Sequence, residues 1–319
     1  MADILQIPSC GGTTGTFNSG IPLCDIIRGI PMGLIGLDAG VGFSAAERAD
    51  NATFVAALIT KTRAARGSRA YPFFSLTNFE DKSKEHTKAA LGNLTNGEIT
   101  TNDGIPAFAF QHRIGELFHQ KLMEAQNADM TWLIVDKNYV VYGTLDGSTF
   151  RGFSLSEFYV ALPKFGNLST ASSYQFEMTL ESQTEYKENG RFIQSSSALV
   201  AATGIRDVVL AATVASSVLS VSLTAIGGKN LTDLYATELG QAGAWEVKKT
   251  SSGAAVTVSP AFNSSTGKMD LTLSGTPWTG GSTGDAYTVN LVTPAALKAL
   301  TSPIDGYEST GIVSFTKPA

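Results

Sequence analysis

The chain has 319 residues, of which 43% are hydrophobic and 16% charged, and its formal net charge is −5. A chain of this length usually forms two domains, and its apolar content is enough for a sizeable core in each. The acidic balance argues against a dedicated DNA- or RNA-binding face, which would need an excess of Lys and Arg. The low charge also fits a protein that covers much of its surface with partners or with copies of itself.

The first 43 residues are rich in Gly, Ile and Pro and contain no enzyme motif. Residues 1–6 lack the basic and apolar regions of a signal peptide. The run Gly11–Gly15 lacks the Gly-Lys-Ser/Thr ending of a phosphate-binding loop, so we interpret it as an ordinary loop. Cys10 and Cys24 flank it without metal-ligand spacing. Two cysteines are too few for a disulfide framework, so we expect free thiols in a reducing cytoplasm and no zinc site.

A first helix is predicted to begin at Ser44. Ser44 and Glu47 have the spacing of a capping box, in which each side chain satisfies the other residue's backbone N–H. Gly67 follows a basic last turn and is placed to end the helix. The buried face is predicted from residues at helical spacing: Phe54, Val55, Leu58, Ile59 and Thr62.

A long polar stretch then runs from Glu80 to Gly104. It mixes both signs of charge and is punctuated by turn residues such as Asn96-Gly97. A polar excursion of this length in a compact domain is either functional or a solvated loop. If it is functional, we expect it to reach a neighbouring subunit.

A second helix is predicted over about Arg113–Asn127. Three residues near its start, His112, Glu116 and His119, lie at offsets of four and three and could converge on a metal. The arrangement is not His-Glu-x-x-His and no third strong ligand is obvious, so we expect surface helix residues and no metal site. With His86 as the remaining histidine and no Gly-x-Ser-x-Gly elbow, no catalytic residue is assigned. The buried stripe is predicted to be Ile114, Leu117, Phe118, Leu122 and Ala125.

The stretch from Thr131 to Leu180 alternates apolar and polar residues with a period of two. Its segments are broken by Asx and Gly turns, which is typical of half-buried antiparallel strands. Residues 154–159 fit either a short helix or a strand, and Glu185–Arg191 is predicted to be a polar turn. The strand segments are Trp132–Val135, Tyr139–Thr144, Phe150–Phe153 and Tyr174–Leu180.

A domain boundary is predicted near Ala202–Gly204, because the composition then becomes poor in Phe and rich in Ser, Thr, Gly and Ala. Short strands with Gly-rich turns predict a sandwich that is Ig-like in architecture only, with helical turns at Leu231–Leu239 and Pro294–Leu300. The strand candidates are Val208–Leu210, Val218–Ala225, Trp245–Lys249, Ala254–Ser259, Met269–Ser274, Tyr287–Val292 and Gly311–Phe315.

The uncharged segment Val208–Ile226 raises the question of a membrane span. Leu219, Val221 and Leu223 alternate with hydroxyl residues. A helix would spread those hydroxyls around its circumference, whereas paired strands place them on one wet face. We therefore predict two strands with a turn between them and no membrane span.

Several segments of the chain resemble virion structural proteins of crAss-like and related Bacteroides-infecting tailed phages, and the second half is similar to Ig-like modules appended to such proteins. The resemblance implies a homo-oligomeric ring or tube of the tail or neck around the DNA channel, assembled in the host cytoplasm. The segments that carry it are Ile30–Gly33 through the Ser44 helix, Tyr71–Phe74, Asn78–Asp81, Asp136–Gly147 and Phe150–Gly152, and then Asn230–Tyr235, Ala244–Trp245, Gly284–Tyr287 and Gly306–Ser309.

The sequence therefore predicts an α+β, β-rich protein. Residues 1–203 would form an antiparallel sheet domain with two helices that assembles, and residues 204–319 an Ig-like β-sandwich that projects outward. The expected partners are copies of the chain and neighbouring virion proteins, with no catalytic residue, metal, cofactor or sequence-specific nucleic acid. One alternative is an adhesive module that contacts a host-surface glycan, weakly through residues 204–319. A glycan hydrolase is disfavoured because no paired carboxylates occur in a recognisable context.

Overall fold

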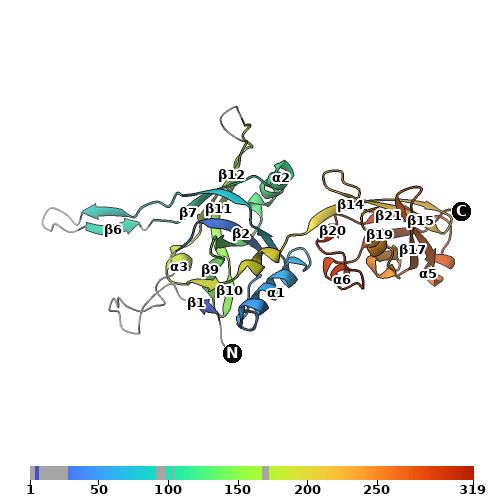
Figure 1. Ribbon diagram of the computed structural model, residues 1–319, viewed down its shortest axis with the longest axis horizontal. Coiled ribbons are helices and arrows are strands. Elements are labelled where there is room, and N and C mark those ends of the chain that lie inside the picture. The colour runs from blue at the N-terminus through green and yellow to red at the C-terminus, as the bar shows by residue number, and fades with distance from the viewer. Residues whose placement is uncertain (1–3, 7–27, 91–97, 103, 167–171) are drawn as a thin grey trace. The chain divides into compact units, whose positions relative to one another are not determined.

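The computed structural model describes residues 4–6, 28–90, 98–102, 104–166 and 172–319 (Figure 1). Strands make up 44% of the structure and helices 19%, and the sheets are antiparallel apart from one parallel strand pair in the second unit, so the predicted β-rich α+β class is confirmed. The chain divides into two compact units, residues 1–62 with 66–203 and residues 63–65 with 204–319. The main boundary, between Thr203 and Gly204, lies in the small-residue stretch noted in the sequence.

The first unit is built on one long antiparallel sheet that folds into two layers. Phe153 and Ser154, at the start of β11 (Phe153–Val160), pair with β8 (Met130–Asp136) in the first layer. Residues 155–160 of β11 pair with β12 (Tyr174–Leu180) in the second layer, past an irregularity between Leu155 and Glu157. Such an irregularity bends a strand, which lets it join two layers. The main path runs β1 (Leu5–Gln6), β13 (Gly190–Gln194), β9 (Val140–Asp146), β8 (Met130–Asp136), β11 (Phe153–Val160), β12 (Tyr174–Leu180), β7 (Ala107–His112) and β4 (Leu76–Asp81). The second layer consists of β11, β12, β7 and β4. Beside β8 lies β2 (Pro31–Asp38), which pairs with β3 (Ala70–Phe73), and beside β9 lies β10 (Thr149–Arg151).

Strand β8 is buried on both faces, although its alternation predicted a half-buried strand. Leu133 and Val135 pack into one core with α1, while Trp132 and Ile134 pack into another with the second layer. The Trp132 ring lies 4.9 Å from the ring of Phe158 in β11. The prediction of a half-buried strand was wrong because α1 covers one face of β8 and the second sheet layer covers the other, so neither face is exposed to solvent.

The first α-helix, α1 (Asn51–Thr62), begins later than predicted. The capping box does form, with the Ser44 backbone N–H donating to Glu47 Oε2 at 2.8 Å, but it opens the 3-10 turn η2 (Ala46–Arg48). Asp50 is the residue that caps α1, because its Oδ1 accepts the Thr53 backbone N–H at 2.8 Å. The predicted face is buried at Phe54, Val55, Leu58 and Thr62.

A buried carboxylate organises the turn between β8 and β9. Asp136 is fully buried and accepts the backbone N–H groups of Gly29 (2.8 Å), Asn138 (2.8 Å) and Val140 (2.9 Å), and the Tyr142 hydroxyl (2.9 Å). Burial and the contact with Asp136 raise the pKa of Tyr142. With four donors on two oxygens, the carboxylate is satisfied without a cation.

The polar stretch after β4 forms a two-stranded ribbon of β5 (Thr87–Ala90) and β6 (Glu98–Asn102). This hairpin extends away from the body of the first unit (Figure 1). Residues 82–89 are all exposed. At its base the Lys82 backbone N–H donates to the Ala107 carbonyl at 2.8 Å, and the Ala107 N–H donates to Ser83 Oγ at 3.2 Å.

The second unit is a sandwich of two sheets around one core, as predicted, and the further Ig-like assignment stays a prediction. The core holds Trp245, Trp278 and Tyr287 together with aliphatic residues of both sheets. One sheet has the order β17 (Thr257–Asn263), β18 (Lys268–Ser274), β15 (Val218–Ala225), β14 (Arg206–Ala215) and β20 (Tyr307–Ser309), and the other β16 (Trp245–Lys249), β19 (Ala286–Leu291) and β21 (Val313–Thr316). The short helices are α4 (Ala236–Leu239), α5 (Thr276–Thr279) and α6 (Pro294–Lys298).

The uncharged segment Val208–Ile226 contributes to the antiparallel pair β14 and β15, which confirms the prediction of two strands. Leu219, Val221 and Leu223 point into the core, and the intervening hydroxyl residues are half-buried. Among the helices of the described residues, none is long and apolar enough to cross a bilayer.

Candidate functional site

The outward face of the second layer is polar and acidic. Inward residues of its strands, such as Phe110, Phe176 and Met178, fill the core. Alternate residues point the other way, and the register aligns them in rows across the four strands. One row contains Glu80, Ala109, Glu177 and Tyr159. The row on one side of it contains Asn78, Gln111 and Gln175, and the row on the other side contains Ala107, Thr179 and Glu157.

Three glutamates therefore share one sheet face with amides and small residues. The single described ion pair on this face joins Lys82 Nζ to Glu177 Oε1 at 2.6 Å, with both side chains 37% exposed. A solvated pair of this kind contributes little to stability. The chemical consequence is a surface that repels polyanions rather than one that binds them.

The β5–β6 hairpin is the second candidate feature. A two-stranded ribbon is at best marginally stable in water unless it packs against something else. Its exposed charged residues include Lys84, Glu85, His86 and Lys88. Contact with a partner would therefore increase the stability of the ribbon.

The third feature is a buried pair of histidines. His112 and His119 are both fully buried, and His112 Nε2 lies 3.2 Å from His119 Nδ1. The Ile114 backbone N–H donates to His112 Nδ1 at 3.3 Å, so Nε2 carries the proton of neutral His112 and donates it to His119 Nδ1. His119 Nε2 then donates to the Ala161 carbonyl at 2.7 Å. The tautomers follow from the one arrangement that satisfies every partner.

The environment of His112 favours its neutral ring. Burial, and next the neighbouring His119, lower the pKa of His112 to about 4. Tyr174 of β12 stacks on His112 with ring centres 5.3 Å apart. Burial, and next the hydrogen bond that its hydroxyl donates to Glu116, raise the pKa of Tyr174. The carboxylate is thus engaged by the tyrosine rather than by the histidines.

The expectation that His112 and His119 are surface helix residues was wrong. His112 ends strand β7, and α2 (Glu116–Glu124) begins after a turn at Gly115. Strand pairing with Leu76 and Tyr174 carries His112 inward, and His119 faces it from the helix. The described residues contain no group of three His, Cys, Asp or Glu side chains suited to a metal ion. Cys10, Cys24 and the Gly11–Gly15 loop lie outside the described residues.

The placement of α2 also differs from the prediction. Leu122 is buried and Phe118 packs against Phe73, but Ile114 is 42% and Leu117 50% exposed. His119 occupies the inward position, and this turns the first turn of the helix outward. Sequence periodicity could not reveal this orientation of the helix, because the hydrophobic pattern counts a histidine as a polar residue.

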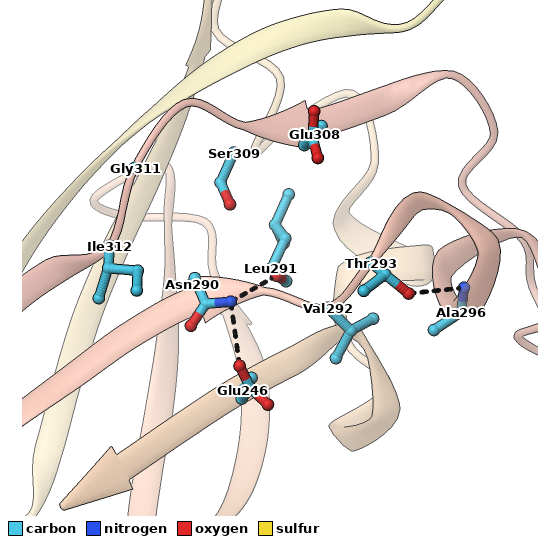
Figure 2. Close-up of a pocket in the computed structure, with 10 residues that line it drawn as sticks. All are labelled: Glu246, Asn290, Leu291, Val292, Thr293, Ala296, Glu308, Ser309, Gly311 and Ile312. Atoms are coloured by element: carbon cyan, nitrogen blue, oxygen red, sulfur yellow. Dashed lines mark hydrogen bonds between the residues drawn. The ribbon is translucent and has the colours of Figure 1, made fainter. Parts of the chain in front are cut away.

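The second unit contains a pocket of about 440 Å³ (Figure 2). Asn290 lies in it, and its amide donates to Glu246 Oε2 at 3.2 Å and to the Leu291 carbonyl at 2.8 Å. A hydrogen bond with Lys248, and a further one with Asn290, lower the pKa of Glu246. Polar and aliphatic residues line it together, without an aromatic side chain: Glu246, Asn290, Leu291, Val292, Thr293, Ala296, Glu308, Ser309, Gly311 and Ile312.

This pocket offers hydrogen-bonding groups without a stacking platform. Glu246 and Glu308 lie on different walls, contributed by β16 and β20, and Thr293 and Ala296 come from the start of α6 (Figure 2). Such a lining suits a small ligand that carries both polar and apolar groups. No family model, no curated protein and no solved structure matches the chain.

Proposed function

We propose that the chain is a structural subunit of a tailed-phage virion, which assembles with copies of itself into a ring or tube of the tail or neck around the DNA channel. Residues 1–203 would make the assembly contacts, and residues 204–319 would face outward. The proposal takes its starting point from the resemblance of the sequence, and the observation that carries it is the projecting β5–β6 hairpin.

The hairpin supports assembly because its described part projects from the body of the first unit (Figure 1). Its base is fixed by a backbone bond from Lys82 to Ala107, at the start of β7, and residues 82–89 are exposed. A ribbon that gains stability only on contact is suited to bind another subunit. Each copy of the chain supplies such an arm, so a second copy is the simplest partner.

The sheet edge at β4 offers a further contact. Among the described residues β4 pairs only with β7, so the other edge presents backbone N–H and C=O groups. The edge strand β3 carries Pro72, which removes one backbone donor. Pairing of β4 with a neighbouring copy around a rotation axis would satisfy these groups and close a ring.

The acidic face fits a channel that passes DNA. Glu80, Glu157 and Glu177 share the outward side of the second layer. A protein binds DNA largely by releasing the counterions that phosphates hold, and a carboxylate surface cannot do this. If this face lines the channel, DNA slides past it without being retained.

The test is assembly of a chain with a shortened hairpin. Residues 85–104 are replaced by Asn-Gly, which keeps the Lys84 N–H bond to the Ile105 carbonyl and suits a tight hairpin turn. Sedimentation velocity and electron micrographs should show rings or tubes for the intact chain and monomers for the shortened one, with both melting at the same temperature. A shortened chain that assembles as well as the intact chain would refute the role of the hairpin, and an intact chain that stays monomeric would refute the subunit proposal.

A second candidate function is glycan binding by the second unit, favoured by the hydrogen-bonding groups of the pocket around Asn290. A glycan panel should then bind the full chain, and Asn290→Ala should abolish binding because it removes the amide that bridges Glu246 and Leu291. Unchanged binding by that variant, or no binding by the intact chain, would exclude the pocket as a glycan site.

A further inference from the structure

We infer that the pocket around Asn290 in the second unit selects a sugar that carries a free, protonated amino group. We call this site the Asn290 pocket (Figure 2). The inference rests on the second candidate function, glycan binding by the second unit, and it names the class of sugar that this site would take.

The Asn290 pocket is lined by two carboxylates. Glu246 of β16 and Glu308 of β20 contribute them from different walls (Figure 2). No Lys, Arg or His is among the described residues that line the pocket. Carboxylates in a concave site attract a cation and repel an anion. The lining therefore disfavours an acidic sugar and favours a basic one.

Glu246 keeps acceptor sites for a ligand. Its Oε1 pairs with Lys248 Nζ at 2.5 Å, and its Oε2 accepts an amide N–H of Asn290 at 3.2 Å. Lys248 is not one of the lining residues, so this pair holds the carboxylate from outside the pocket. An ionised carboxylate has about four acceptor sites, and these two contacts leave about two of them for the donors of a ligand.

Asn290 presents a further acceptor. It lies on β19 and pairs in register with Glu246 on β16. Its amide nitrogen donates to Glu246 Oε2 at 3.2 Å and to the Leu291 carbonyl at 2.8 Å, which engages both N–H groups. Its amide oxygen can only accept a hydrogen bond. The lining thus offers mainly acceptors, together with the hydroxyls of Thr293 and Ser309.

An ammonium group complements a set of acceptors. It has three donors and no acceptor, and its hydrogen bonds to carboxylates are roughly twice as strong as neutral ones. Sugar hydroxyls both donate and accept, so they can pair with the hydroxyls of Thr293 and Ser309. Ile312, which is 66% exposed, offers an apolar contact for the C–H groups of a sugar ring. The volume of about 440 Å³ lies in the range of small-molecule sites.

The lack of an aromatic side chain in the lining makes the amino group decisive. An aromatic ring would contribute apolar contact to any sugar, whether charged or neutral. Without one, the binding free energy must come largely from hydrogen bonds. A neutral sugar exchanges its hydrogen bonds with water for similar ones with the protein and gains little. A protonated amino group adds charge-assisted hydrogen bonds, which a neutral sugar lacks.

The test compares sugars that share a ring and differ at one substituent. The intact chain is titrated, with NMR or calorimetric detection, with glucosamine, glucose, N-acetylglucosamine and glucuronic acid, and with the corresponding galactose series. At least one amino sugar should bind about tenfold more tightly than its neutral parent and its N-acetylated form, because acetylation removes the charge. The acidic sugars should not bind. Ethanolamine, an amine without a ring, should bind about tenfold more weakly than the amino sugar.

Two variants connect the preference to the pocket. Glu246→Gln and Glu308→Gln each remove one charge and keep the size of the side chain. Each should weaken binding of the amino sugar about tenfold and change binding of the neutral sugar little. The matched control is Glu238→Gln, which removes a carboxylate of the second unit that does not line the pocket and should leave the affinity unchanged. Thermal melting checks that every variant is folded at the temperature of the titration.

The outcomes separate this inference from the function on which it rests. If neutral or N-acetylated sugars bind as tightly as the amino sugars, the inference is wrong while glycan binding stands. A preference for amino sugars that survives both pocket variants, or equal binding of ethanolamine, also overturns the inference. If no sugar binds, the inference and the second candidate function both fail, and the proposal of a virion subunit is unaffected.

Discussion

Acidification should destabilise the first unit through the buried histidine pair. The pKa of His112 is about 4 in the folded chain, against an ordinary value of 6.5. A histidine with a lowered pKa binds its proton more readily in the unfolded chain, so its contribution to stability is complete above pH 6.5 and is lost as the pH falls towards 4. Protonation of His112 at Nδ1 also removes the acceptor for the Ile114 N–H.

The expected loss of stability follows from the size of the pKa shift of His112. Each pKa unit corresponds to about 1.4 kcal/mol, so the free energy of unfolding should fall by about 3 kcal/mol between pH 7 and pH 4. This is a large part of the 5–15 kcal/mol that stabilises a typical domain. The shift originates in burial, since both rings are inaccessible to solvent and are covered by Tyr174 and Phe118.

The measurement is urea unfolding at pH 7, 6, 5 and 4.5 for the intact chain, His112→Gln and His86→Gln. His112→Gln should be less stable at pH 7 and lose less stability on acidification, so that the two curves converge. His86 lies exposed on the hairpin, and its replacement should leave the loss unchanged. NMR of the three histidine rings should show His112 titrating near pH 4. Equal losses in the intact chain and His112→Gln would refute the reasoning.

Three further outcomes are expected. Asp136→Asn should cost about 3 kcal/mol of unfolding free energy because an amide cannot accept all four donors, whereas Tyr142→Phe should cost about 1 kcal/mol; equal costs in denaturant titrations would contradict this. Phe110→Ala, at a fully buried ring, should cost about 3–5 kcal/mol, and Phe165→Ala less than about 0.5 kcal/mol; a comparable effect at both would be inconsistent with their burial. Limited proteolysis should cut near Ala202–Gly204 and release a stable C-terminal fragment, and cleavage scattered through both halves would count against separable domains.

The local periodicity of the sequence determined most of the strands. The alternation at Tyr174–Leu180 and at Val218–Ala225 each gave a strand with one buried face. The capping box at Ser44 formed as its spacing predicts. These features depend on residues within a few positions of each other, because backbone geometry fixes which side chains share a face.

The tertiary structure decided where those strands are buried and which distant residues meet. Burial of β8 on both faces depends on α1 and on the second layer, neither of which its own alternation can indicate. The acidic face combines residues of four strands in rows set by register.

The histidine pair is the clearest case. His112 and His119 are seven residues apart, and they meet only because β7 ends and the chain turns at Gly115 before α2 begins. Their contact turns Ile114 and Leu117 outward, against the helical pattern of the sequence. A pattern records only which residues share a face; which face is buried depends on the free energy of packing against elements far away in the chain.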